Sequence, residues 1–234
     1  MPCLVVVVAR TSWPPNTWYS SEPGLGDPRF KPSPMPTARF YLAAAQIRNG
    51  IVAAVGGKRY SLGISGANEV YDLLSNTWTS KAVMPMGRSN LAAAQIQSGI
   101  ISVVGGEVSS TYYNRNDVYD YSTNTWLAKA PMPTGRDRLA AAQVQSGMVA
   151  AIGGSGGSVT FQGTNEIYDY STNTWLAKAP MPTGRDRLAA AQVQSGMVAA
   201  IGGSGGSVTF QGTNEIYDYS TNTWLAKAPM PTGR

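Results

Sequence analysis

Residues 119–185 of this 234-residue chain recur without a single change as residues 168–234, at an offset of 49. Two earlier copies have diverged but keep the same frame. A period of this length means that one supersecondary unit is repeated and that stacked neighbours bury a shared core. The repeat therefore constrains the fold more strongly than any single residue does.

Three markers recur once per copy, at spacings of 48 or 49 residues. They are a double glycine, a tyrosine followed by aspartate, and a tryptophan seven residues after that tyrosine. The glycines are Gly56, Gly57, Gly105, Gly106, Gly153, Gly154, Gly202 and Gly203, the tyrosines are Tyr71, Tyr119, Tyr168 and Tyr217, and the tryptophans are Trp78, Trp126, Trp175 and Trp224. Glycine pairs permit close backbone approach, and the aromatic residues supply apolar surface for packing units together. We therefore predict that these recurring residues have a structural role in every unit.

The third copy shows how one unit is built. A small-residue run at 139–145, an apolar run at 148–153, an alternating segment at 165–170 and a tryptophan-containing segment at 174–178 each predict a strand. Turn residues separate them, and the Pro-containing connector at 179–185 cannot continue a ladder. Four strands in about 49 residues predict one blade of a β-propeller.

The pattern resembles the kelch repeat, whose blade has a double glycine after the second strand, a tyrosine in the third and a tryptophan in the fourth. WD-type blades are the rival family, but they carry Gly-His and Trp-Asp pairs, and this chain has no histidine. The resemblance covers residues 39–234 and implies an all-β, kelch-type propeller. Its four full four-stranded blades are expected at 39–88, 89–136, 137–185 and 186–234.

The first 38 residues fit the frame only in part. Asn16-Thr17-Trp18 matches a fourth strand and Pro34-Met35-Pro36 matches a connector, so residues 1–38 are predicted to be an irregular segment with a remnant blade strand. The kelch resemblance implies about six or seven blades. We therefore expect a fragment of a longer protein or an array that self-associates to close its ring. A compact ring of four or five blades is the third alternative.

Charge and residue counts narrow the classes of function. The net charge is +5, but it is spread over the first third of the chain, whereas nucleic-acid surfaces need clustered Lys and Arg. With no histidine and one cysteine, neither imidazole chemistry nor a disulfide framework is available. No apolar run has the length of a membrane span. We expect no cofactor, metal, nucleic acid or membrane as a partner.

Candidate binding residues follow from strand direction. Strands alternate, so the second-to-third-strand loops and the connectors between blades share one side of the propeller, which we call the connector face. The candidates there are Arg88, Arg136, Arg138, Arg185 and Arg187 in connectors, and Tyr112, Tyr113, Phe161 and Phe210 in loops. In the kelch family this face often binds peptides or acidic ligands through arginines, which implies that Arg138 and Arg187 clamp a carboxylate or phosphate. The alternative is that the connector arginines lock neighbouring blades and that the aromatic residues fold back onto their own blade.

Catalytic motifs are weak. Residues 171–175 lack the Asp and Gly of a sialidase-type Asp box, and residues 153–157 lack both the GxGxxG spacing and the P-loop lysine. Near-identical blades present a repeated surface, which suits multivalent binding. The sequence therefore predicts a non-catalytic scaffold that binds a protein or peptide, acidic ones included, through the connector face. The alternative is a carbohydrate-binding or sialic-acid-processing kelch propeller.

Overall fold

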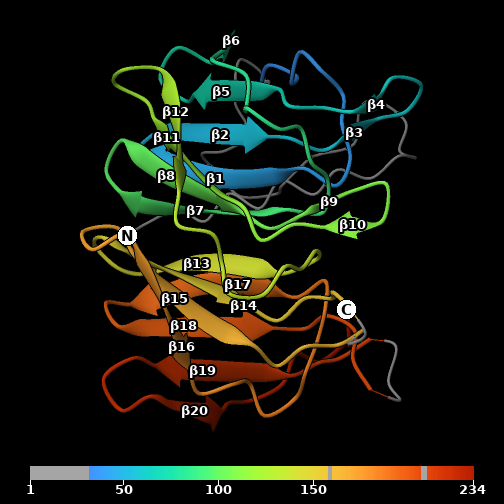
Figure 1. Ribbon diagram of the computed structural model, residues 1–234, viewed down its shortest axis with the longest axis vertical. Coiled ribbons are helices and arrows are strands. Elements are labelled where there is room, and N and C mark those ends of the chain that lie inside the picture. The colour runs from blue at the N-terminus through green and yellow to red at the C-terminus, as the bar shows by residue number, and fades with distance from the viewer. Residues whose placement is uncertain (1–31, 158–159, 207–209) are drawn as a thin grey trace, which may run out of the picture.

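The chain folds into four small antiparallel sheets of four strands each, arranged as the blades of a β-propeller (Figure 1). The structure is a computed structural model that describes residues 32–157, 160–206 and 210–234. In these ranges there is no helix, and so none long and apolar enough to cross a membrane. The predicted all-β propeller with four four-stranded blades is confirmed. The predicted remnant strand around residues 16–18 lies outside the described residues.

In each blade the four strands pair in chain order. Blade 1 contains β1 (Ala43–Arg48), β2 (Ile51–Val55), β5 (Asn68–Asp72) and β6 (Thr77–Ser80). Blade 2 contains β7 (Ala92–Gln97), β8 (Ile100–Val104), β11 (Asn116–Asp120) and β12 (Thr125–Lys129). Blade 3 contains β13 (Ala140–Gln145), β14 (Met148–Ile152), β15 (Asn165–Asp169) and β16 (Thr174–Lys178). Blade 4 contains β17 (Ala189–Gln194), β18 (Met197–Ile201), β19 (Asn214–Asp218) and β20 (Thr223–Ala226).

Two short strand pairs extend the second-to-third-strand loops of the first two blades. They are β3 (Lys58–Arg59) with β4 (Gly63–Ile64), and β9 (Glu107–Val108) with β10 (Thr111–Tyr112). The sequence predicted these stretches only as part of a loop. Each pair has only two residues per strand, too short for a period-2 pattern to stand out.

The strand register gives each blade two different faces. In blade 3, Tyr168 stands opposite Val149 on one side and Trp175 on the other, with the two aromatic rings 5.2 Å apart. We call this side, formed by Val149, Ala151, Tyr168 and Trp175 and their equivalents, the aromatic face. The other side, formed by Ala140, Ala142, Val144, Ala150, Ile152 and Ile167 and their equivalents, is the alanine face. Because side chains alternate along a strand, both faces follow directly from the sequence.

The apolar core lies between blades. The alanine face of blade 3 packs against Val198, Ala200, Tyr217 and Trp224 on the aromatic face of blade 4. The same pairing joins blade 1 to blade 2 and blade 2 to blade 3. The small alanines allow the innermost strands β1, β7, β13 and β17 to lie side by side in that order. Within the described residues, β17 makes no comparable contact with β1, so the array is open between blades 4 and 1.

Candidate functional site

The connectors meet at one end of the propeller axis through a chain of backbone hydrogen bonds. The N–H of Asn90 donates to the carbonyl of Tyr41 at 2.9 Å, that of Arg138 to Asn90 at 2.8 Å, and that of Arg187 to Arg138 at 2.8 Å. All four residues have φ between 52° and 57°, which is uncommon outside glycine. These hydrogen bonds hold one residue of each connector in the same unusual conformation around the axis.

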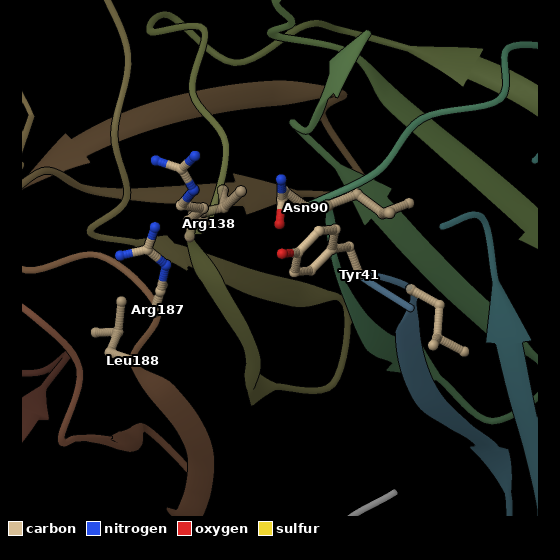
Figure 2. A pocket seen from close by; sticks show the side chains of 8 residues that line it. Tyr41, Asn90, Arg138, Arg187 and Leu188 are labelled. Atoms are coloured by element: carbon tan, nitrogen blue, oxygen red, sulfur yellow. The ribbon is translucent and has the colours of Figure 1, made fainter. Parts of the chain in front are cut away.

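The side chains of these four residues line a hollow on the connector face. Tyr41, Asn90, Arg138 and Arg187 surround it, together with the leucine that follows each of them, and its volume is about 190 Å³. Figure 2 shows the two guanidinium groups next to each other on one side, with the Tyr41 hydroxyl and the Asn90 amide on the other. The volume suits a single small polar group, since drug-sized ligands occupy cavities of roughly 300 Å³ or more.

Both arginines of the hollow remain accessible. The side chain of Arg138 is 32% exposed, and that of Arg187 is 58% exposed. Arg138 Nε lies 3.4 Å from Asp137 Oδ2, and Asp186 Oδ2 lies 3.7 Å from Arg138 Nη1 and 3.6 Å from Arg187 Nη1. At these distances the contacts are ion pairs longer than hydrogen bonds, and neither guanidinium donates a hydrogen bond to a described residue. Their N–H groups are therefore available to a ligand.

The carboxylates next to the arginines are buried. Burial raises the pKa of Asp137 to about 6, Arg138 opposes the shift, and the negative charges of Glu107 and Asp186 add to it. Burial also raises the pKa of Asp186, against the opposing charges of Arg187 and Arg138. With this pKa Asp137 is still mostly ionised at pH 7, so its carboxylate stands as an anion beside the Arg138 guanidinium. Among the described residues, no group of three or more His, Cys, Asp or Glu side chains could hold a metal ion.

Three of the candidate arginines lie inside the protein instead. The side chains of Arg88, Arg136 and Arg185 are fully buried and form ion pairs with Asp117, Glu166 and Glu215 at 2.7, 2.8 and 2.9 Å. Burial lowers the pKa of each guanidinium, and the paired carboxylate opposes that shift. A ligand on the surface cannot reach these groups, so they are not part of the candidate site. Their position matches the alternative reading, in which connector arginines lock neighbouring blades.

The four aromatic candidates do not line the hollow. Tyr112 and Phe210 are exposed, whereas Tyr113 and Phe161 are half-buried. Phe161 and Phe210 occupy the same position in identical repeats, so their difference comes from their surroundings and not from their sequence. The structure thus brings Arg138 and Arg187 together and leaves the aromatic residues in the loops.

Two polar residues of the hollow were not predicted from the sequence. Tyr41 and Asn90 follow Arg39 and Arg88 by two positions, as Arg138 and Arg187 follow the connector arginines of later blades. Superimposing the diverged copies on the identical ones would have found them. A search for arginines alone could not, because the residue type differs at this position.

The fold and the hollow define a β-propeller array with a polar, arginine-containing depression at the connector end of its axis. A comparison with protein-family models gives no match for the chain, and a comparison with curated proteins gives none either.

Proposed function

We propose that this chain is a non-catalytic, kelch-type propeller scaffold that binds a protein or peptide by seating an acidic group in the hollow of the connector face. The observation that supports the proposal is the pair Arg138 and Arg187, side by side, accessible, and with no guanidinium hydrogen bond to a described residue. Guanidinium groups bind carboxylates bidentately, which suits recognition of a planar anion.

The other groups of the hollow fit the same ligand. The Tyr41 hydroxyl and the Asn90 amide face the arginines and offer further donors to a carboxylate (Figure 2). The buried carboxylates of Asp137 and Asp186 reduce the net positive charge, so one acidic group gains little from the charge of the site alone. Binding then depends on further contacts, for which the exposed Phe210 and Tyr112 on the same face are available.

The test is a binding titration monitored by fluorescence anisotropy. A labelled Glu-rich peptide is the probe, and a Lys-rich peptide is the negative control. We expect Arg138→Met to weaken binding of the acidic peptide at least tenfold. Arg48→Met is the matched control, because it removes the same charge at the first-to-second-strand turn, on the opposite side of the propeller. Equal loss in both variants, or no binding of the acidic peptide by the parent chain, would reject the proposal.

A carbohydrate ligand is the second candidate. A sialic acid carries one carboxylate, and a hollow of about 190 Å³ with two arginines accepts that group as well as a peptide carboxylate. Free sialic acid in the same titration separates the two. Displacement of the acidic peptide by sialic acid at a concentration where acetate has no effect would favour the carbohydrate.

A further inference from the structure

Among the residues that the structure describes, no blade covers the alanine face of blade 4. Residues 188–193 have the same sequence as residues 139–144, yet Val144 is fully buried and Val193 is 58% exposed. Ala189 is likewise exposed, whereas its equivalent Ala140 is buried. Since the sequences are the same, the difference lies only in what covers the two faces. Blade 4 covers blade 3, and no described segment covers blade 4 in the same way.

The chain itself carries the surface that fits this face. The alanine face of blade 3 is covered by Val198, Ala200, Tyr217 and Trp224 of blade 4. Blade 1 has the same four residue types at the same register positions, namely Val52, Ala54, Tyr71 and Trp78. Tyr71 is half-buried, whereas Tyr119, Tyr168 and Tyr217 at the equivalent position are fully buried. The aromatic face of blade 1 therefore matches the uncovered alanine face of blade 4.

We propose that a second copy of this chain docks the aromatic face of its blade 1 onto the alanine face of blade 4, and that the reciprocal contact closes a ring of two copies. Each contact continues the interface that already joins blades 1 to 2, 2 to 3 and 3 to 4. Two copies supply eight blades, which is within the range of about four to eight found in propellers. The contact is head-to-tail, so it forms a closed assembly only if the rotation per blade closes the ring.

One segment must move for this contact to form. Trp224 Nε1 donates to the carbonyl of Ala179 in the preceding connector at 2.8 Å, and Trp78 Nε1 donates to Ser33 in the same way at 2.8 Å. Ser33 of the incoming copy therefore occupies the place of the connector at 228–234. That connector is the one that yields, because most of its side chains are exposed and Arg234 makes no ion pair with a described residue, whereas Arg39 pairs with Glu69 at 2.7 Å.

The first test is the mass of the full chain in solution, by size exclusion with light scattering over a concentration series. We expect about twice 24.7 kDa for the parent chain. Val193→Lys places a charge on the docking face and should raise the dissociation constant of the dimer at least tenfold. Leu225→Lys is the matched control. Leu225 is 58% exposed, and its equivalent Leu176 is still 55% exposed although blade 4 covers blade 3, so this position lies outside the contact.

Complementation tests the direction of docking. Val52→Lys damages the aromatic face of blade 1 and should likewise raise the dissociation constant of the dimer at least tenfold. At a concentration where each variant alone is a monomer, mixing it with Val193→Lys should restore a species of twice the mass, because one intact face remains on each chain. A Val52→Lys variant that still dimerises would show that two alanine faces meet each other, and the proposal would be wrong. Higher oligomers that Val193→Lys abolishes and Leu225→Lys preserves would support the docking face and overturn closure at two copies.

Thermal unfolding shows whether the alanine face of blade 4 is covered by a second copy or by another part of the same chain. If the parent chain is a monomer at all concentrations and Val193→Lys lowers its melting temperature while Leu225→Lys does not, then the chain covers its own alanine face and the proposal is overturned. If the parent is a monomer and both variants melt like it, nothing covers the face and the proposal is equally overturned.

Discussion

The guanidinium of Arg136 lies 2.8 Å from the carboxylate of Glu166, and both side chains are almost completely buried. The arginine comes from the connector that enters blade 3 and the acid from its third strand, β15. The carbonyl of Arg136 also accepts the N–H of Gly106 in blade 2 at 2.9 Å. One residue thus binds the preceding blade through its backbone and the following blade through its side chain. The same arrangement recurs at Arg88 and Arg185.

Removing this arginine should be strongly destabilising. Arg136→Met leaves the Glu166 carboxylate buried, with the Thr134 hydroxyl as its one hydrogen-bond donor among the described residues. The loss of one partner of a buried ion pair costs about 3–5 kcal/mol. Arg234→Met is the matched control at the equivalent connector position, where the side chain is exposed, and it should change stability by about 0.5 kcal/mol or less. Urea unfolding followed by tryptophan fluorescence measures both. Similar midpoints for the two variants would show that the buried pair does not stabilise the blades.

A second link between blades depends on an asparagine. The side-chain oxygen of Asn173 accepts the Tyr168 hydroxyl at 2.8 Å and the N–H of Ala130 in the preceding connector at 2.9 Å, and its φ is 55°. Asn173→Gly keeps this backbone conformation but loses both hydrogen bonds, so we expect it to lower the free energy of unfolding by about 1–3 kcal/mol. Asn173→Ala should lose about 1 kcal/mol more, because alanine is strained at positive φ.

Asn173→Asp provides the control for this pair of variants, since it keeps an oxygen acceptor and tolerates positive φ. It should remain closest to the parent protein in urea unfolding. If Asp is as damaging as Gly, the two hydrogen bonds do not account for the effect.

The blades could be predicted from the sequence because their determinants are local and repeated. The seven-residue spacing from Tyr168 to Trp175 spans one tight turn, so it places the two rings opposite each other on neighbouring strands. The alternation in residues 140–144 assigns alternate side chains to the two faces. A single blade has two apolar faces, and repeated blades bury these faces by stacking on one another.

The site could be predicted only in part, because its properties depend on distant neighbours. Arg136 and Arg138 are two residues apart in one connector, and only the fold shows that Glu166 draws the first inside while the second stays in the hollow. Val144 and Val193 have the same local sequence and opposite exposure, since the neighbouring blade decides it. No pattern within one blade contains that information.

The buried Asp137 predicts a pH effect on stability. Its folded-state pKa of about 6 lies above the ordinary value of 3.8, so the folded state binds this proton more tightly than the unfolded state does. The stabilising contribution is present below pH 3.8 and is lost as pH rises through 6. Asp137→Asn removes the buried charge, which should raise stability at pH 7–8 by about 1 kcal/mol, or about 2–4 °C in Tm.

The gain from Asp137→Asn should shrink as the pH is lowered from 7 to 5, which melting curves at several pH values measure. Asp169 supplies a control of opposite sign. Hydrogen bonds from Ser171 and Thr172 lower its pKa, so Asp169→Asn should reduce Tm at pH 7. A lower Tm for Asp137→Asn at pH 7 would mean that attraction to Arg138 and Arg187 outweighs the cost of burial.

The second glycine of the motif should tolerate no side chain, for two reasons: its positive φ and the closeness of a neighbouring backbone. A glycine in the same blade that has a positive φ but no close neighbour separates these two causes. Gly154 has φ of 101°, and a Cβ there would lie 2.6 Å from the carbonyl oxygen of Asp137. Gly147 has φ of 85° and nothing within 4 Å of the same atom. Gly147→Ala should therefore lose only the cost of positive φ, about 1 kcal/mol, whereas Gly154→Ala adds a backbone clash and should lose about 3 kcal/mol or more. The difference between the free energies of unfolding of the two variants, measured in urea, gives the cost of the clash. Equal losses would mean that the glycine pair is needed only for its φ angles, and that the connector does not pass as close to the end of β14 as the structure shows.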